Sequence, residues 1–322
     1  NQFRLDTADG SWPASDVQMR ITHGADDALS GVRASATYVN LDDLRYLVPW
    51  APQETRDRLL ELAPAGILRD VGIELADLQG EELQFDIAAD LENAGIAAVD
   101  GRPRASNFSG RIRADRSGGR LEIASNELGI DLGELLPEPL RFDDALGTII
   151  WRRNQDGIIV LSDSVSLRNR DLVSDMSLQV GVPSDDRAPH IDFESTWQVF
   201  DVSRMHRYLP VRYIMPNLRQ WLTDALVAGS ITRGTTRFTG SLDEFPFEGG
   251  EGVFRVDARL EDAVLRYSPK WPAPEFRHLD IVVDNMRLYS TENSAVNMGN
   301  FVEDARIEIP DLRKPVLAIE AF

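Results

Sequence analysis

The side chains that most often build metal sites and nucleophilic centres are scarce in this sequence. It contains four histidines, at positions His23, His190, His206 and His278, and it contains no cysteine. None of the histidines falls in an HExxH or HxH arrangement, so no zinc centre of the usual types is predicted. The absence of cysteine excludes a disulfide framework and a cysteine nucleophile. We therefore expect neither a metal nor a cofactor.

Segments that bind phosphate groups or present a nucleophilic serine are also missing. No GxGxxG or GxxxxGK(S/T) loop follows a predicted strand, and no GxSxG segment occurs. Three tryptophans beside prolines, Trp12, Trp50 and Trp271, are candidates for a carbohydrate-binding platform. No residue is predicted to be catalytic.

Carboxylates are the abundant reactive group, with 53 Asp and Glu against 34 Lys and Arg and a net charge of −19. Pairs such as Asp42-Asp43 and Asp143-Asp144 suit a glycoside hydrolase only if two carboxylates face each other across a cleft. Adjacent residues of a strand point to opposite faces, which is the wrong placement for shared chemistry. We expect no enzyme and keep a carbohydrate-active β-rich enzyme as an alternative.

The acidic balance also argues against two classes of partner. Nucleic acid needs a basic protein surface to meet its phosphates, and so does broad adhesion to an anionic membrane. Neither partner is expected for a chain with this net charge.

Apolar and polar residues alternate at period two along most of the chain, the pattern of antiparallel strands with one buried face. Two stretches break this pattern and are predicted to be helices, near residues 52–63 and 216–228. The second carries an apolar stripe of Leu218, Trp221, Leu222 and Leu226, with Gly229 placed as its C-terminal cap. The expected fold is mainly β: an elongated, curved antiparallel sheet with two short helices.

The two predicted helical segments belong to an internal repeat with an offset of roughly 160–170 residues. Arg45-Tyr46-Leu47 matches Arg207-Tyr208-Leu209, and Ala65-Gly66-Ile67 resembles the segment from Ala228 to Ile231. The sequence predicts a first β-groove repeat over 1–140, a second over 141–310, and the start of a further repeat in 311–322. The chain opens without a methionine and ends within an alternating segment, so we expect the remainder of a longer chain at both ends.

Two short helices cannot shield the apolar faces of so many strands. Either two sheets close on each other as a sandwich, or one curved sheet leaves an apolar trough that needs a ligand. An acyl chain suits such a trough, because each buried methylene contributes about 0.8 kcal/mol. A scaffold or interaction module with a closed sandwich core is the other alternative. The predicted lining residues are Leu83, Phe85, Ile87, Ile191, Phe193, Trp197, Phe254, Val256, Leu279, Ile281 and Val283.

One stretch resembles a known family. The residues that carry the resemblance are Tyr208-Leu209-Pro210, Leu218, Trp221-Leu222, Ala225-Leu226, Gly229, Gly240, Phe245-Pro246-Phe247, Gly252, Phe254, Tyr267 and Trp271-Pro272. Together they are similar to the C-terminal-half signature of YhdP-type proteins in the AsmA-like superfamily. Looser matches cover the first 140 residues, where the Trp-Leu and Phe-Pro-Phe elements are missing.

The resemblance implies a large protein of the Gram-negative envelope, anchored in the inner membrane by an N-terminal helix and extending through the periplasm. Repeated β-groove units in such proteins form a hydrophobic channel, as in bridge-like lipid-transfer proteins. The implied function is non-enzymatic transport of phospholipid toward the outer membrane, with phospholipid acyl chains as the ligand. The resemblance carries no catalytic motif and identifies no partner at either membrane.

Overall fold

The alternating segments of the sequence form long antiparallel strands in a computed structural model. The structure describes residues 2–3, 6–7, 10–24, 27–46, 49, 53–78, 83–97, 103–211, 214, 216–266, 270, 272–314 and 316–320. The chain divides into two compact units, the first formed by 1–132 with 141–160 and the second by 133–140 with 161–322. The last change from the first unit to the second, after Val160, falls inside the strand β11 (Gly157–Arg168).

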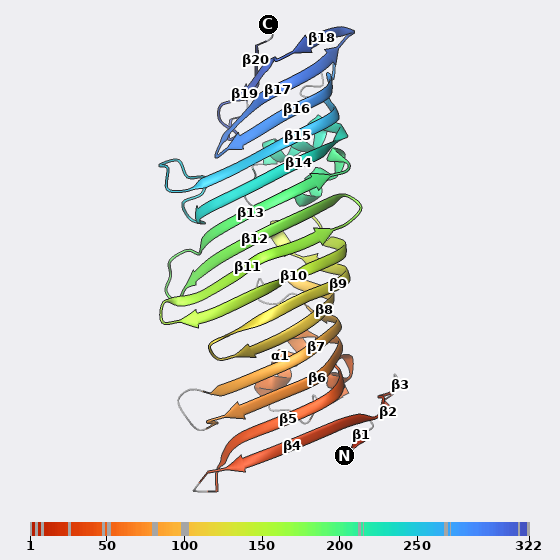
Figure 1. The fold of residues 1–322 in the computed structure, drawn as a ribbon, viewed down its shortest axis with the longest axis vertical. Coiled ribbons are helices and arrows are strands. Elements are labelled where there is room, and N and C mark those ends of the chain that lie inside the picture. The colour runs from red at the N-terminus through yellow and green to blue at the C-terminus, as the bar shows by residue number, and fades with distance from the viewer. Residues whose placement is uncertain are drawn as a thin grey trace. The chain divides into compact units, whose positions relative to one another are not determined.

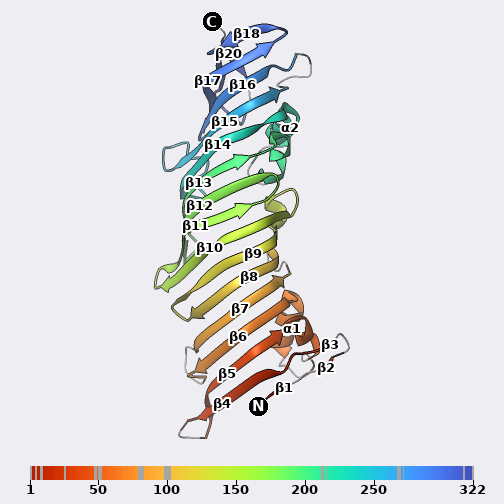
Figure 2. The ribbon, with the colours of Figure 1, turned by 45° about the vertical axis from the view of Figure 1, so that its right-hand side comes forward.

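The first unit is a meander in which each strand pairs with the next along the chain, from β4 to β9 (Figure 1). One helix, α1, lies against one face of this sheet near β6 (Figure 2). The elements are β1 (Gln2–Phe3), β2 (Asp6–Thr7), β3 (Gly10–Ser11), β4 (Ser15–His23), β5 (Leu29–Asn40), η1 (Asp42–Tyr46), α1 (Gln53–Leu62), β6 (Ala65–Ala76), β7 (Gln84–Ile96), β8 (Arg104–Asp115), β9 (Gly118–Asp131) and β10 (Leu140–Asn154).

The second unit repeats this arrangement, and its strands pair in chain order from β12 to β17. Its elements are η3 (Gly133–Leu135), β11 (Gly157–Arg168), β12 (Leu172–Pro183), β13 (His190–Val199), η4 (Val202–Tyr208), α2 (Pro216–Ala225), β14 (Leu226–Ser241), β15 (Val253–Leu265), β16 (Glu275–Asp284), β17 (Arg287–Asn297), β18 (Asn300–Glu303), β19 (Arg306–Ile309) and β20 (Ala318–Glu320). The prediction of a mainly β, antiparallel fold with two short α-helices is therefore confirmed, and short 3-10 helices accompany them.

Both units use the same local structure where the chain returns from its helix to the sheet. Gly66 in β6 has φ +94°, and an added Cβ atom would lie 2.5 Å from the carbonyl oxygen of Asn93. Gly229 in β14 has φ +118°, and its added Cβ would lie 2.7 Å from the Cα of Ala263. Each glycine faces a bulge on the next strand, where Asn93 and Asp262 both have φ +50°. The two glycines therefore share one local backbone geometry.

The end of α2 corrects one expectation. The helix ends at Ala225, and Leu226 is the first residue of β14, directly opposite Leu265. Gly229 is consequently a strand residue and not a helix cap. Sheet hydrogen bonding replaces the helical pattern at this point, since the Arg266 amide donates to the carbonyl oxygen of Ala225 at 2.9 Å. The apolar spacing continued past the true end of the helix because Leu226 also packs against the core.

A buried carboxylate joins η4 to the sheet of the second unit. Asp171, with 2% of its surface exposed, lies in the turn before β12. Its two oxygens accept from Arg204 Nη1 at 3.2 Å and from Arg207 Nη1 at 2.6 Å. Arg207 also pairs with Glu138. Arg207, the first residue of the Arg207-Tyr208-Leu209 segment, therefore anchors η4 beside β12.

Candidate apolar binding face

Register places the predicted lining residues of the second unit on one face of its sheet. Residues directly opposite each other on antiparallel strands share a face. Rows of such residues start at β12 and end at β14, β15 or β16. The rows that contain predicted residues are Val180-Ile191-Gly240, Leu178-Phe193-Phe238-Phe254, Met176-Ser195-Thr236-Val256-Val283, Ser174-Trp197-Gly234-Ala258-Ile281 and Leu172-Val199-Ile231-Leu260-Leu279. This surface is called the apolar face below.

One end of the apolar face is covered by η4. Leu279 is 1% exposed and belongs to a buried cluster with Val202 of η4. Trp197 and Ile281 pack against the same cluster. The Trp197 ring lies over Gly234, where an added Cβ would be 2.4 Å from the indole, and its Nε1 donates to Thr236 Oγ1 at 2.9 Å. These three predicted residues serve the protein core in this structure.

The helix α2 covers a second part of the same face. Leu218 is buried, and Trp221 and Leu222 pack with it. Their cluster includes Val283 and Leu288 from the sheet, together with Ile309 and Leu312 from the following chain. Three residues of the stripe predicted for the helix, Leu218, Trp221 and Leu222, form this packing surface. Over β16 and β17 the helix occupies the space that a ligand would need.

The rest of the apolar face is only partly shielded. Ile191, Phe193 and Val256 are half-buried, and they belong to neither of the two clusters that the helices complete. Met176 and Leu178 on β12 continue this surface and are also half-buried. A half-buried apolar surface several strands wide is an unfavourable contact with water, and a bound apolar ligand would relieve it.

An aromatic cluster closes the strand ends opposite η4. Phe238 and Phe254 are cross-strand partners, with ring centroids 6.3 Å apart. Phe245 and Phe247 of the connecting loop add two rings, 5.9 and 5.2 Å from Phe238. Phe247 is 2% exposed, and its ring lies where a Cβ on Gly240 would stand. The Phe-Pro-Phe segment therefore packs against the strand ends as well as forming a turn. Phe254 belongs to the same aromatic cluster.

The first unit carries an apolar face of the same construction. Phe85 lies opposite Leu75, and Ile87 lies opposite Ile73 and Ala114. Leu83, directly before β7, is 47% exposed. The rows reach β4 at Met19 and Ile21, which are 68% and 50% exposed. The lining predicted from the sequence does not include these two residues, although their alternation with polar neighbours in 17–21 indicates that they share one face of a strand.

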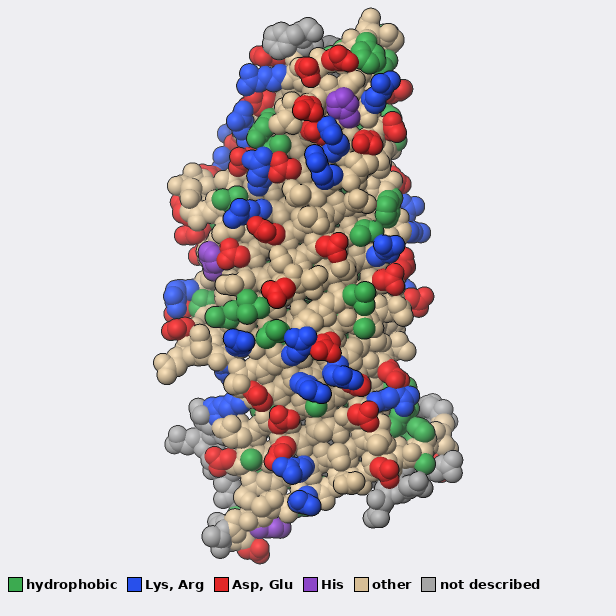
Figure 3. All heavy atoms as spheres, viewed as in Figure 1, with side chains coloured by type: hydrophobic (Ala, Val, Ile, Leu, Met, Phe, Trp, Pro, Cys, Tyr) green, Lys and Arg blue, Asp and Glu red, His purple; other side chains and the backbone are tan. Residues whose placement is uncertain are grey.

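The opposite face of both sheets is polar. Figure 3 views the strands from the side away from the helices and shows basic and acidic side chains interspersed over them. Cross-strand ion pairs include Arg33–Glu74 at 2.5 Å and Arg111–Asp90 at 2.5 Å. The hydrogen bond from Arg33 lowers the pKa of Glu74, and the hydrogen bond from Arg111 lowers that of Asp90. These pairs keep one face in water and leave the apolar face for packing or ligand.

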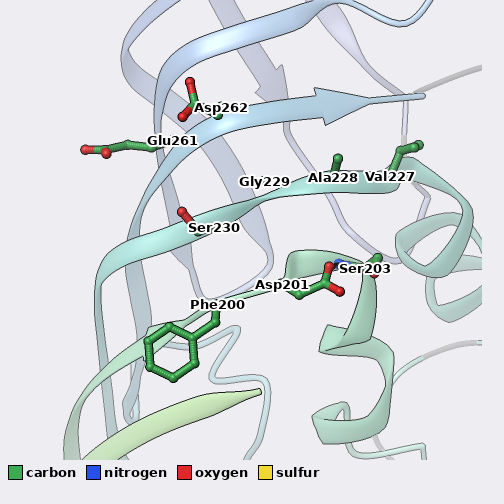
Figure 4. Close-up of a pocket in the computed structure, with 9 residues that line it drawn as sticks. All are labelled: Phe200, Asp201, Ser203, Val227, Ala228, Gly229, Ser230, Glu261 and Asp262. Atoms are coloured by element: carbon green, nitrogen blue, oxygen red, sulfur yellow. Dashed lines mark hydrogen bonds between the residues drawn. The ribbon is translucent and has the colours of Figure 1, made fainter. Parts of the chain in front are cut away.

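A cavity of about 620 Å³ lies between η4 and the start of β14 (Figure 4). It forms because β13 ends at Val199, opposite Ile231, so the first residues of β14 extend past it. The carboxylate of Asp201 caps η4 by accepting from the Ser203 amide at 3.0 Å and from its hydroxyl at 2.6 Å. Glu261 accepts from Thr232. The lining mixes the apolar Phe200 and Val227 with polar side chains, and none of its residues belongs to the rows of the apolar face.

The other candidates from the sequence do not gather into a site. Trp12 is 7% exposed and donates through Nε1 to the buried Asp43 at 2.6 Å, so it offers no exposed platform for sugar. Trp50 and Trp271, and Tyr267 of the family signature, lie outside the described residues. Within the described ranges, no group of three or more His, Asp or Glu residues could hold a metal ion. In the same part of the chain, no helix is long and apolar enough to span a membrane.

Comparison with known proteins identifies the family. No solved structure matches the chain. Over 222 residues the chain is 26% identical to a protein of Escherichia coli (strain K12) named intermembrane phospholipid transporter YhdP. The aligned region covers 68% of this chain and 17% of that relative, so the chain spans a small part of the relative's length. The model of the YhdP protein family matches residues 1–321, and the chain therefore belongs to the YhdP family.

Proposed function

We propose that this chain holds phospholipid acyl chains on its apolar faces and thereby forms part of a route for phospholipid between two membranes. No chemical step is involved. The observation that carries the proposal is the partial cover of the apolar face. The helices and the aromatic cluster cover the ends of this face, and the half-buried Ile191, Phe193 and Val256 lie between them. The name of the Escherichia coli relative supports the phospholipid as the ligand.

The distribution of charged side chains also supports ligand binding on the apolar face alone. The polar face of each sheet holds arginine–carboxylate pairs that favour water, as Arg255–Asp257 at 2.8 Å illustrates. An acyl chain therefore gains free energy on one face only. A closed sandwich would place a second sheet on the apolar face, whereas the described residues of the second unit place η4 and α2 there.

The proposal extends to location and to partners. As a segment of a YhdP-type protein, the chain would lie in the periplasm, tethered to the inner membrane by a segment outside residues 1–322. Its ligand would enter and leave through proteins or lipid at either membrane. The predicted β-groove repeats, 1–140 and 141–310, would be successive parts of the lipid path.

Lipid extraction tests the proposal. The purified chain, incubated with phospholipid vesicles and re-isolated, should carry phospholipid that mass spectrometry detects. Phe193→Asp places a charge on the apolar face and should reduce bound lipid by about tenfold or more, because a carboxylate among acyl chains is strongly disfavoured. Gln198→Glu adds the same charge to the polar side of the same strand, opposite Val173, and should leave lipid binding unchanged. Equal lipid loads for the two folded variants would refute the proposal.

A further inference from the structure

The strand ends of the first unit form a cavity of about 640 Å³ with an unusual charge arrangement. The start of β7 lines one side with Gln84, Phe85 and Asp86. The β8–β9 turn contributes residues 115–117, and the end of β10 contributes Arg153 with the two residues after it. Phe85 belongs to the apolar face of the first unit, so the cavity lies where that face meets the polar strand ends.

Asp86 is a carboxylate whose strand neighbours are both acidic. It lies directly opposite Glu74 on β6 and Asp115 on β8. Glu74 is already held by Arg33. Asp115 is held by the β8–β9 turn, accepting from the Ser117 amide at 2.6 Å and from the Gly118 amide at 3.1 Å, and the Ser117 hydrogen bonds lower its pKa. Like charges on facing strands are destabilising, so Asp86 favours an added cation.

Arg153 supplies the opposite charge in the same cavity. Its amide donates to the Ser117 carbonyl oxygen at 2.7 Å, which fixes the end of β10 beside the β8–β9 turn. Its side chain is exposed, and among the described residues its guanidinium forms no ion pair, either with Asp86 or with another carboxylate. Arg116 in the turn lines the cavity as a second guanidinium. One cavity therefore presents separated positive and negative groups.

We propose that this cavity binds the headgroup of a zwitterionic phospholipid, one that carries a phosphate and a primary amine. Arg153, with Arg116, meets the phosphate, and Asp86 meets the ammonium group. Asp86 and Phe85 point to opposite faces of β7 but line the same cavity, so the lipid passes over the strand end and its acyl chains lie over Phe85 and Ile87 on the apolar face of the first unit. An anionic headgroup without an amine would pair with Arg153 and leave Asp86 without a cation. This inference rests on the proposed function and adds a headgroup preference to it.

The test measures headgroup choice separately from lipid binding. The purified chain is incubated with vesicles that contain equal amounts of phosphatidylethanolamine and phosphatidylglycerol, re-isolated, and its bound lipids are counted by mass spectrometry. The wild-type chain should be enriched in phosphatidylethanolamine by about two- to fivefold, the ratio that exposed ion pairs can supply. Asp86→Asn should abolish the enrichment at an unchanged lipid load. Asp185→Asn, in an exposed turn of the second unit, should leave it intact.

Two further measurements distinguish an error in the headgroup inference from an error in the proposed function. Arg153→Gln should lower the load of both lipids, and glycerophosphoethanolamine, a free headgroup without acyl chains, should compete only weakly because the apolar contact is missing. Lipid bound without headgroup enrichment, or enrichment that survives Asp86→Asn, would overturn the headgroup inference alone. A wild-type chain that binds neither lipid would overturn the proposed function with it.

Discussion

Gly229 on β14 and Ala263 on β15 lie so close that a methyl group on the glycine would stand 2.7 Å from the alanine Cα. Ala263 is fully buried. Gly66 has the same relationship to Ala94 in the first unit, also at 2.7 Å. Each contact lies beside a bulge of the next strand, where Asp262 and Asn93 have φ +50°.

The first prediction concerns that glycine. Gly229→Ala forces a side chain into a positive φ and into backbone atoms of β15, and should lower the free energy of unfolding by about 2–4 kcal/mol. Chemical denaturation measures the change. Gly181→Ala is the matched control, because a Cβ there meets nothing within 4 Å. The two variants should differ clearly, and equal stability would show that the close approach is absent in solution.

The second prediction concerns the anchor of η4. Asp171→Ala removes the carboxylate that Arg204 and Arg207 share and leaves a buried space beside them. It should lower the free energy of unfolding by about 3 kcal/mol. Asp185→Ala removes an exposed carboxylate that pairs with Arg187 at 2.9 Å, and should leave the thermal midpoint unchanged. If Asp171→Ala were as harmless as its control, the network would not hold η4 to the sheet.

The third prediction distinguishes the two α-helices. Leu218→Ala on α2 removes a buried side chain that packs against Ile309 and Leu312. It should lower the free energy of unfolding by about 2–4 kcal/mol. Leu60→Ala on α1 removes a side chain that is 60% exposed, and should be close to neutral. Denaturant midpoints of the two variants measure the difference. Similar losses would mean that α2 does not cover the apolar face as described.

The fourth prediction concerns acid. Asp90 and Asp201 have lowered pKa values in the folded chain, through hydrogen bonds from Arg111 and Ser203 respectively. A lowered folded pKa contributes stability above the ordinary carboxyl pKa of about 4, and that stability is lost as pH falls through the folded value. The free energy of unfolding should therefore decrease below about pH 4.

A double-mutant cycle assigns part of this acid dependence to one pair. Asp90→Asn and Arg111→Gln should each flatten the loss of stability at low pH, and the double variant should add little to either. Additive effects of the two substitutions would show that the pair does not act as a unit. An unfolding free energy that rises toward pH 3 would contradict the sign of the pKa shifts.

Alternation in the sequence predicted the faces of the sheet well, because direction of a side chain follows from its parity along a strand. Phe193 and Val256 came to the same face as predicted because the hydrogen-bonded register kept their parity aligned from strand to strand. The sequence could not show which part of that face is covered. Leu279 and Phe193 have the same pattern, yet only Leu279 is buried in the cluster with η4.

Two features depended on contacts between distant residues and left no local signal. Leu226 keeps the helical spacing of its predecessors, but pairing with Leu265 makes it a strand residue. Asp86 resembles the other exposed acids of the chain, and only the register shows that its neighbours are Glu74 and Asp115. The Phe-Pro-Phe segment of the family signature packs as one cluster with Phe238 and Phe254, a contact that its sequence alone does not show.

Site-specific photocrosslinking shows directly whether phospholipid lies on the apolar face. A benzophenone amino acid replaces Phe193 in one variant and Glu194, its neighbour on the polar face, in another. The purified chains are mixed with vesicles that contain radiolabelled phospholipid, irradiated, and separated by denaturing electrophoresis. We expect a labelled band for position 193 and none for position 194. Equal labelling at both positions, or none at 193 in a folded chain, would contradict binding on the apolar face.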